Sequence, residues 1–383
     1  MRKMIILMYD DLNTLIKKGE VVERYYNPKN YFKKIDFFLI NQKKPLTSDL
    51  KKMTGNAKVN FYNIKLTFLQ KVLLFFNLPF LSNHLENIVK NIKNKKPDLI
   101  RCYNLNFQIF IAQILNNKFN IPYIISLHYD LVNHLNNKNF LISYILKKRI
   151  IAVLNKAYRI LPVYKSAARF LIDNKIKNFT ICYNFTKTIK KKKTIRKDKH
   201  IHFVCTNRQF HYKNPINIIK AIKEIEDARL TLIGDGPLNH YLQNYVKLNR
   251  LSNRVFFIKK IKNSEYIKIL GNFDVFVNCS EINEFSKGMI EAISSGLPII
   301  SNHQSIKIPE LSRNFCLLNF NTPEGYKISM LKIINNHLLM KKLCKHAKKV
   351  YLKSYETKNC EKKFEKIYET VFNKDQVNVR YRY

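Results

Sequence analysis

The stretch that decides the fold is NEFSKGMIEAISSGLPII, residues 283–300. A polar turn leads into an apolar amphipathic segment, then a Gly-Leu-Pro break, then a short apolar run. This order predicts a loop, a helix that begins near Ser286 or Lys287, and a buried strand, which is the repeating unit of a parallel α/β sheet. Glu291 falls in the middle of this helix among apolar neighbours, a place where a carboxylate needs a partner or a function.

The same unit recurs in both directions along the chain, because short apolar runs alternate with amphipathic segments. In the first half, buried strands are predicted over residues 4–9, 36–40, 98–103, 123–128, 159–164 and 179–184. In the second half, they are predicted over residues 200–206, 228–234, 254–260, 274–280, 297–301 and 314–319. Helices are predicted over residues 107–119, 214–225, 237–248 and 355–372. We therefore expect an α/β fold with two doubly wound, Rossmann-like domains that face each other across a cleft.

A basic run, IKKKKTIRKDKH at residues 189–200, separates the two alternating series. Like charges repel and extend a chain, so this run predicts a linker over residues 191–199 between domains at 1–190 and 200–354. A nucleic-acid arm is the alternative, but the run lacks interleaved aromatic residues, and we expect no nucleic-acid partner.

Charge and cysteine content limit the class of protein. The 383 residues include 69 Lys and Arg against 27 Asp and Glu, which gives a net charge of +42. Such a charge attracts polyanions, but the lysines are spread throughout, so a general compositional drift and a selected basic surface both remain open. The seven cysteines form no C-x-x-C pair, which indicates reduced, buried thiols in a cytosolic protein.

The N-terminal apolar run is too short for a signal peptide, and no apolar stretch is long enough to span a membrane. We therefore expect a soluble or membrane-surface protein. The amphipathic stretch 66–93 suits an acidic membrane face or, equally, a helix of the core.

Polar residues after the predicted strands are candidates for ligand binding, because ligands of open parallel sheets bind beyond the carboxyl ends of the strands. The first amides of the helix near Ser286 favour an anionic or hydroxyl-rich ligand. Glu291, about one turn further on, can accept hydrogen bonds from a diol such as a ribose, or lie on a solvated helix face. The apolar neighbours favour the ligand interpretation.

Two more motifs follow strands of the second domain. Arg208 and Lys213 in VCTNRQFHYKNP, residues 204–215, suit a diphosphate, although they are also two cations among 69. Gly234 and Gly236 in LIGDGPL are two of only eight glycines, and they permit a close backbone approach or simply a tight turn.

The first domain offers weaker candidates. His128 ends a predicted strand, where it can bond a substrate hydroxyl or serve the structure. Gly19 lies in the loop after the first strand, and Glu20 and Arg24 follow at helical spacing. We assign these last three residues to the acceptor side of the crevice, with an ordinary glycine turn as the alternative.

Taken together, these motifs resemble those of a known enzyme family. In order along about residues 200–312, TNRQFHYKN, Gly-Asp-Gly-Pro, CSEINEFSKGMIEAISSGLPII and a later Pro-Glu are similar to the motifs of retaining GT-B glycosyltransferases of family four. LIKKGEVVERYYNP resembles the start of members that build bacterial surface polysaccharides. The matching residues are Arg208, Lys213, Gly234, Asp235, Gly236, Pro237, Phe285, Glu291, Ala292, Gly296, Pro298, Pro309 and Glu310, with His128 and Asn184 in the first domain.

The family pattern has two glutamates with seven residues between them. This chain departs from the pattern at the first of the two. Counting back from Glu291 places Asn283 there, with Glu284 one position later. Either Asn283 replaces the acid, or one residue is deleted and Glu284 serves. Ser286 stands where the family has a glycine.

The resemblance implies retaining, metal-independent transfer of a hexosyl unit. Glu291 would hold the nucleotide ribose, while Arg208 and Lys213 neutralise the departing diphosphate. The implied catalytic set is His128, Arg208, Lys213, Asn283, Glu284 and Glu291. The implied donor-binding set is Gly234, Asp235, Gly236, Phe285, Ser286, Lys287 and Gly288.

The resemblance also implies the partners. The donor would be a UDP- or GDP-linked sugar, used as co-substrate without a cofactor or metal, and no D-x-D motif appears in a matching place. The acceptor, a glycan or lipid-linked saccharide of surface polysaccharide biosynthesis, would bind the first domain, to which a helix at 355–375 crosses back. We expect a cytoplasmic protein that also associates peripherally with the inner face of the cell membrane. The alternatives are a sugar-nucleotide epimerase of the same fold and a polyanion- or membrane-binding protein on an inactive transferase fold.

Overall fold

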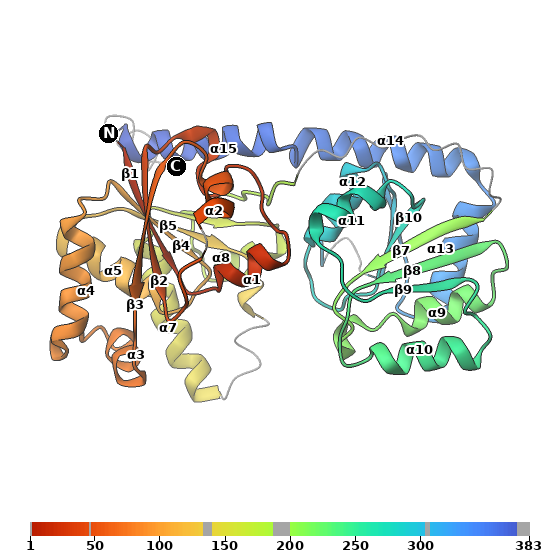
Figure 1. Ribbon diagram of the computed structural model, residues 1–383, viewed down its shortest axis with the longest axis horizontal. Helices are drawn as coiled ribbons and strands as arrows, with labels where there is room; N and C mark the ends of the chain where they lie inside the picture. The colour runs from red at the N-terminus through yellow and green to blue at the C-terminus, as the bar shows by residue number, and fades with distance from the viewer. Residues whose placement is uncertain (1, 46, 133–139, 187–199, 303–306, 374–383) are drawn as a thin grey trace. The chain divides into compact units, whose positions relative to one another are not determined.

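The computed structural model describes residues 2–45, 47–132, 140–186, 200–302 and 307–373. The chain divides into two units (Figure 1). The first comprises the described residues of 1–17, 21–183 and 360–383, and the second comprises those of 18–20 and 184–359. The linker predicted over residues 191–199 lies outside the described residues.

The first unit is built on a six-stranded sheet with the order β3-β2-β1-β4-β5-β6, in which all neighbouring strands pair in parallel. Its strands are β1 (Lys3–Met8), β2 (Lys34–Ile40), β3 (Lys58–Ile64), β4 (Leu99–Tyr103), β5 (Tyr123–Leu127) and β6 (Arg159–Pro162). Every residue of the central β1 is buried, which explains why its sequence is one continuous apolar run rather than an alternating one.

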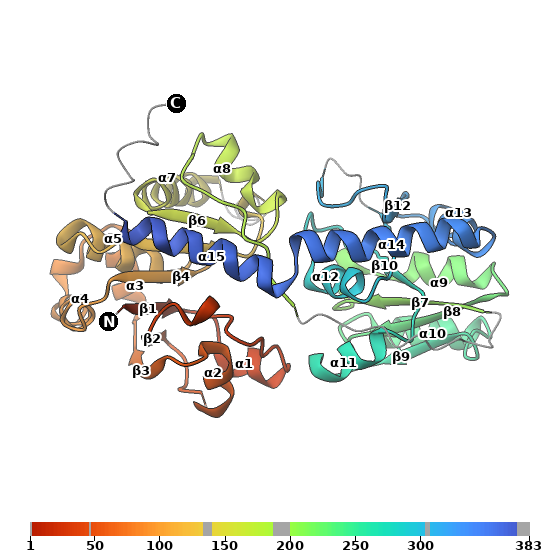
Figure 2. The ribbon, with the colours of Figure 1, turned by 90° about the horizontal axis from the view of Figure 1, so that it is seen from above.

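Helices cover both faces of this sheet, with α4 and α5 on one side and α2 on the other (Figures 1 and 2). The helices of the first unit are α1 (Leu12–Lys17), η1 (Pro28–Asn30), α2 (Thr47–Thr54), α3 (Phe68–Phe75), η2 (Pro79–Leu81), α4 (Asn83–Asn94), α5 (Gln108–Phe119), α7 (Phe140–Lys156), η3 (Ser166–Ala168), α8 (Arg169–Asp173) and, in large part, α15 (Thr357–Phe372). The predicted helix at 107–119 is therefore confirmed as α5, and the stretch 66–93 is divided between α3, η2 and α4.

Two sequence expectations for this sheet are wrong. Residues 179–184 do not form a strand, and Phe179 makes only an isolated bridge to Ile160. The sixth strand is instead β3, where only Ile64 is buried. An edge strand that is partly exposed has no continuous apolar run, so the periodicity did not reveal it.

The second unit repeats the architecture with the order β12-β11-β10-β7-β8-β9, again parallel throughout. All six predicted strands are confirmed, as β7 (Ile201–Thr206), β8 (Ala228–Ile233), β9 (Val255–Ile258), β10 (Val275–Asn278), β11 (Ile299–Ser301) and β12 (Cys316–Leu318). Its helices are η4 (His211–Lys213), α9 (Ile216–Lys223), α10 (Asn239–Leu248), α11 (Asn263–Leu270), α12 (Lys287–Ser294), α13 (Pro323–Ile334) and α14 (His337–Ser354). Its core packs β7, β8 and β10 against α9, α10 and α13.

A buried arginine fastens α15 to the first sheet. Arg101 of β4 is 2% exposed, and its guanidinium donates to the Ser126 hydroxyl at 3.2 Å and to the Tyr368 hydroxyl of α15 at 2.9 Å. The same group lies 4.7 Å from the ring centroids of Tyr103 and Phe364. A buried cation is costly unless it is bonded, so these hydroxyls and rings stabilise the docking of α15.

Within the described residues, no helix combines the length and the apolar character that crossing a bilayer requires.

The bond between Arg101 and Tyr368 gives a stability prediction. Tyr368→Phe removes the hydroxyl and leaves a buried guanidinium N–H unpaired, which we expect to lower the free energy of unfolding by about 1–3 kcal/mol. Urea unfolding followed by far-UV circular dichroism measures the change. Tyr158→Phe is the matched control, because the Tyr158 hydroxyl also bonds α15, at the Thr370 carbonyl, but at the surface. Equal effects of the two substitutions would contradict the role given to Arg101.

Candidate functional site

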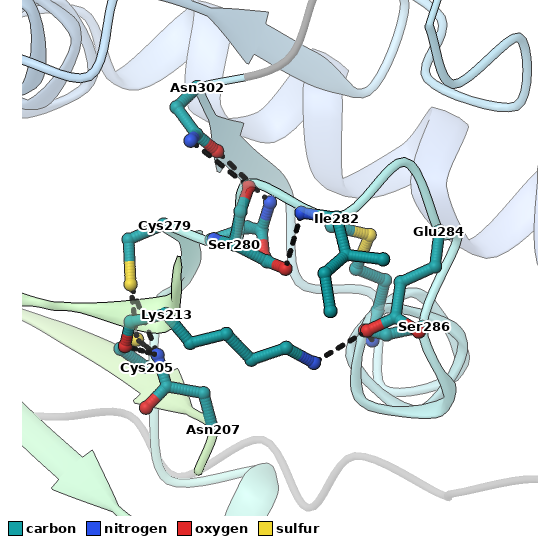
Figure 3. Close-up of polar contacts among 11 residues, drawn as sticks. Cys205, Asn207, Lys213, Cys279, Ser280, Ile282, Glu284, Ser286 and Asn302 are labelled. Atoms are coloured by element: carbon teal, nitrogen blue, oxygen red, sulfur yellow. Dashed lines mark hydrogen bonds and ion pairs between the residues drawn. The ribbon is translucent and has the colours of Figure 1, made fainter. Parts of the chain in front are cut away.

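The loops that follow the strands of the second sheet bring a lysine and a glutamate together. Lys213 lies in η4 after β7, and Glu284 lies in the loop after β10. The Lys213 ammonium is 2.7 Å from Glu284 Oε1, and both side chains are about one-fifth exposed, at 20% and 23% (Figure 3). The acid that contacts Lys213 is therefore Glu284, one of the two residues between which the sequence left the choice open.

Hydrogen bonds to neighbouring loops fix the backbone that carries Lys213. The Asn207 amide donates to the Lys213 carbonyl at 3.1 Å and to Cys279 Sγ at 3.1 Å (Figure 3). Asn207 follows β7 and Cys279 follows β10, so one side chain joins the ends of two adjacent strands. Sequence analysis did not single out Asn207, although it directly follows a buried strand.

The loop that carries Glu284 is held in the same way. The Asn302 amide donates to the Ser280 carbonyl at 3.1 Å, and Ser280 Oγ accepts from the Ile282 amide at 3.2 Å (Figure 3). Ser280 is 5% exposed, so the bend starts from an anchored residue. Glu284 is thus presented by a supported loop.

The predicted helix start at Ser286 is confirmed. Ser286 is the N-cap of α12, and its hydroxyl accepts from the Met289 amide at 3.4 Å. The amides of Lys287 and Gly288 belong to the first turn, where a helix offers no internal acceptor and its dipole favours negative charge. Phe285, beside them, is 2% exposed and packs its ring against Tyr355, so it anchors the loop in the core.

Glu291 is buried in α12, as the apolar flanks of the sequence indicate, with 2% of its surface exposed. Asn263, at the start of α11, donates to Glu291 Oε1 at 2.8 Å, and the Lys287 ammonium lies 3.8 Å away. Burial raises the pKa of Glu291 above its usual range, while the charge of Lys287 and the Asn263 hydrogen bond act in the opposite direction. The carboxylate is only partly compensated in the absence of a ligand. Asn263 is a site residue that sequence analysis missed.

Two glycines after β8 support the loop of Arg208. A Cβ on Gly234, whose φ is +136°, would lie 1.8 Å from the Asn207 carbonyl oxygen, and one on Gly236 would lie 2.6 Å from that of Gln209. The structure thus gives these glycines the close-approach role and places them against the Arg208 backbone. Arg208 itself is exposed. Asp235 between the glycines is also exposed and lies 3.9 Å from the Lys259 ammonium.

The first unit has its own polar cluster at the carboxyl ends of β1, β4 and β5. Asn104 donates to Asp10 Oδ2 at 2.7 Å and accepts from the His128 amide at 3.0 Å. Burial raises the pKa of Asp10, whereas the bond from Asn104 lowers it. Burial, followed by the charge of Arg101, lowers the pKa of His128 to about 4, so its ring is neutral at pH 7.

His128 is thus joined by two residues that sequence analysis missed. The Nε2 atom of His128 is buried and has no hydrogen-bond partner in the part of the chain that the structure describes. Asn104 directly follows β4, and Asp10 is the second residue after β1, so their place after buried strands was the signal available in the sequence.

The three residues predicted for the acceptor side do not form one group. Gly19 and Glu20 belong to the second unit, where a Cβ on Gly19 would lie 3.2 Å from the Asn263 amide and Glu20 Oε2 lies 4.0 Å from the Lys287 ammonium. Arg24 belongs to the first unit and lies 2.9 Å from Glu361 of α15. The helical spacing expected for Glu20 and Arg24 is wrong, because Arg24 has a φ of +54° and no helix spans them.

Comparisons with known proteins concern the family and the fold. Glycosyl transferases group 1 is the family whose model matches, over residues 186–350. The uncharacterised glycosyltransferase MJ1178 of Methanocaldococcus jannaschii is 26% identical over 291 residues, which cover 74% of this chain and 78% of that protein. MJ1069 of the same organism, likewise named an uncharacterised glycosyltransferase, is 26% identical over 241 residues. These cover 58% of this chain and 60% of the length of MJ1069.

A solved structure extends the likeness to nearly the whole chain. The structure of HepE from Anabaena in complex with UDP superposes with a TM-score of 0.75 at 12% identity, and covers 97% of this chain and 100% of HepE. At this identity the likeness concerns the fold alone. With Lys213, Glu284 and Glu291 inside the matched segment, this chain is a glycosyltransferase with the GT-B fold, and its residues 186–350 are similar to the group 1 family.

Proposed function

We propose that this glycosyltransferase moves a hexosyl unit from a UDP- or GDP-linked sugar to a glycan or lipid-linked saccharide, with retention of anomeric configuration. The observation that carries the proposal is that the second unit places two features after strands of one sheet: a buried, partly compensated Glu291 and an ion pair between Lys213 and Glu284. A sugar nucleotide offers a match for each group: a ribose diol, a diphosphate and a sugar.

Glu291 would accept hydrogen bonds from the two ribose hydroxyls. Its carboxylate is held by Asn263 at 2.8 Å and lies in a buried place that raises its pKa. Two hydroxyl donors would stabilise the ionised form, so ribose binding would offset part of the cost of burying the charge. A binding residue that is costly in the free protein is typical of a functional site.

Arg208 and Lys213 would bind the diphosphate. Arg208 is exposed at the end of β7, and Lys213 is held by Glu284 at 2.7 Å in the absence of donor. Negative charge grows on the leaving phosphate in the transition state, and fixed cations at this place lower the barrier. Glu284, released from Lys213, would then accept a hydrogen bond from a hydroxyl of the donor sugar.

The two cations would also take the role that a metal ion has in other transferases, namely to neutralise the leaving diphosphate. We therefore propose that the reaction needs neither metal nor cofactor.

The first-turn amides of α12, at Lys287 and Gly288, would bind sugar hydroxyls or developing negative charge. Support for a nucleotide donor also comes from HepE, a protein of the same fold that was solved with UDP bound.

The acceptor would bind the first unit at the cluster of Asp10, Asn104 and His128. Asp10 is a carboxylate with a raised pKa, suited to accept a hydrogen bond from, or a proton of, an acceptor hydroxyl. The neutral ring of His128 carries a buried Nε2 for a further hydroxyl. We place this acceptor in surface polysaccharide biosynthesis, and the protein in the cytoplasm with access to the inner face of the membrane.

Glu291→Gln is the first test of the donor site. A hydrogen bond to a charged group contributes about 1.5–3 kcal/mol, so we expect the affinity for the preferred UDP- or GDP-sugar to fall by about tenfold to a hundredfold. The folded pKa of Glu291 is raised above its unfolded value, so its charge costs stability above that folded pKa, and the cost shrinks as pH falls through it. The free variant should therefore melt at a higher temperature than wild type at pH 8, with a smaller gap at pH 5.

Thermal shift measures both the donor affinity and the stability of the free protein. The melting temperature is recorded without donor and with each of a panel of UDP-, GDP- and ADP-sugars. Glu265→Gln is the matched control, since Glu265 is an exposed glutamate on the neighbouring α11 and should change neither quantity. If no donor shifts the wild-type melting temperature, the assignment fails. Release of UDP or GDP only when an acceptor is present separates transfer from epimerisation.

Glu284→Gln tests which residue serves as the first acid. Removing the charge frees Lys213 for phosphate, so the affinity for UDP without sugar should rise about threefold to tenfold, while kcat for transfer falls. Isothermal titration with UDP and a coupled transfer assay measure the two changes. Asn283→Ala is the control at the adjacent position and should leave UDP binding unchanged. If instead Asn283→Ala abolishes transfer and Glu284→Gln does not, Asn283 serves as the sugar contact.

Independence from metal is a separate prediction. Because Arg208 and Lys213 supply the positive charge, transfer activity should persist unchanged after dialysis against EDTA and should not rise when Mg²⁺ or Mn²⁺ is added. Arg208→Ala in EDTA should lose most activity. Full rescue of the EDTA-treated wild type by a divalent cation alone would contradict this prediction.

A further inference from the structure

The first unit exposes an unusual concentration of large apolar side chains. Sixteen large hydrophobic residues are exposed in the part of the chain that the structure describes, and five of them lie within residues 68–81. These five, on α3, at its C-cap and on η2, define what we name the α3 face: Phe68 at 82% exposure, Leu69 at 66%, Phe76 at 57%, Phe80 at 59% and Leu81 at 60%. Apolar side chains gathered in this way mark a site of interaction.

The exposure is built into a well-formed local structure. Thr67 and Gln70 form a capping box at the start of α3, with the Thr67 amide donating to Gln70 Oε1 at 2.9 Å. Leu74 is fully buried and packs α3 into the core of the unit. The inner side of α3 is therefore already satisfied, and the exposed residues are held outward by a capped helix.

The sequence around the α3 face is rich in lysine. No acidic residue occurs from residue 50 to residue 85, whereas Lys51, Lys52, Lys58, Lys65 and Lys71 do. The neighbouring α7 contacts α3, because Arg149 Nε donates to the Phe75 carbonyl at 2.6 Å, and both helices are visible at the lower end of the first unit in Figure 1. Immediately before Arg149, α7 exposes Lys147 and Lys148.

The α3 face borders the polar cluster at the carboxyl ends of the strands. The Lys71 ammonium of α3 lies 5.7 Å from the ring centroid of Tyr9 and 5.6 Å from that of Phe107. Tyr9 precedes Asp10, which bonds Asn104 at 2.7 Å. A surface that covers the α3 face therefore lies next to the place where we expect an acceptor hydroxyl to bind.

We propose that the α3 face docks on the surface of a lipid bilayer that contains anionic lipids. Phe68, Leu69, Phe76, Phe80 and Leu81 would enter the boundary between headgroups and acyl chains, while Lys65, Lys147 and Lys148 contact anionic headgroups. α3 has eight residues, too few to cross a bilayer, so it would lie along the interface.

Charge decides between a bilayer and a second copy of the chain. Both copies would present lysine-rich rims without acidic residues over 50–85, so a symmetric contact would place like charges together. An anionic bilayer supplies the opposite charge and an apolar layer at once. The inference goes beyond the proposed reaction: it places a lipid-linked acceptor at the bilayer surface beside Asp10, but it does not depend on donor binding.

Vesicle co-sedimentation of the full chain tests the proposal. Wild type should bind vesicles of phosphatidylcholine and phosphatidylglycerol at 3:1, and bind pure phosphatidylcholine at least ~10-fold more weakly. Phe68→Ser/Leu69→Ser and Phe80→Ser/Leu81→Ser should each lower the partition coefficient on mixed vesicles by ~10-fold or more, since each removes two exposed apolar side chains. Lys147→Gln/Lys148→Gln should lower it by ~5-fold for each lysine.

Phe320→Ser and Leu338→Ser are the matched controls, because these residues are exposed to similar extents, 75% and 79%, but lie in the second unit. Both should bind mixed vesicles like wild type. Equal vesicle binding by wild type and both α3-face variants overturns the proposal. It is also overturned if no protein binds vesicles and sedimentation velocity shows a wild-type dimer that Phe68→Ser/Leu69→Ser dissociates. UDP titration of every variant keeps the two proposals separate, because loss of vesicle binding with intact UDP affinity concerns this surface alone.

Discussion

Parallel pairing of all six strands in each sheet is the constraint on which both units depend. A parallel sheet needs helices on both faces, so its central strands become continuous apolar runs and polar residues are driven to the strand ends. Since all strands of a sheet end at one edge, residues far apart in sequence meet there: Asn207 with Cys279, Lys213 with Glu284 and, in the first unit, Asp10 with Asn104. The candidate sites follow from strand direction before any particular side chain is considered.

Both units bury charged side chains, and two of these, Arg101 and Glu291, are compensated differently. The guanidinium of Arg101 is bonded to the hydroxyls of Ser126 and Tyr368 and lies beside aromatic rings, so its charge is compensated within the protein. Glu291 has the Asn263 amide at 2.8 Å and Lys287 at a longer 3.8 Å, and its pKa remains raised by burial. A carboxylate left partly unsatisfied in a rigid helix is suited to a ligand that brings hydrogen-bond donors.

Most of the fold and part of the site could be predicted from the sequence. Continuous apolar runs marked eleven of the twelve strands, and the polar turn before Lys287 marked the N-cap of α12. The exposed edge strand β3 has no such run, and the apolar run at 179–184 packs without pairing as a strand. Hydrophobic periodicity does not predict contacts between loops that are distant in sequence. The contacts of Glu284 with Lys213 and of Asn263 with Glu291 depend on loop geometry, which an offset of one residue in the sequence changes. The chemical roles of these residues stay predictions.

The docking of α15 has a consequence for synthesis of the chain. The first unit takes two of its buried aromatic residues, Phe364 and Tyr368, from the part of the chain that follows 184–359. On the ribosome, Arg101 emerges long before its hydroxyl partner on α15, whereas the second unit, except for residues 18–20, is contiguous. The unit made first is therefore completed last, and until then it exposes the surface that Tyr368 and Phe364 later cover. The first unit can therefore reach its final structure only after residues 184–359 have been synthesised.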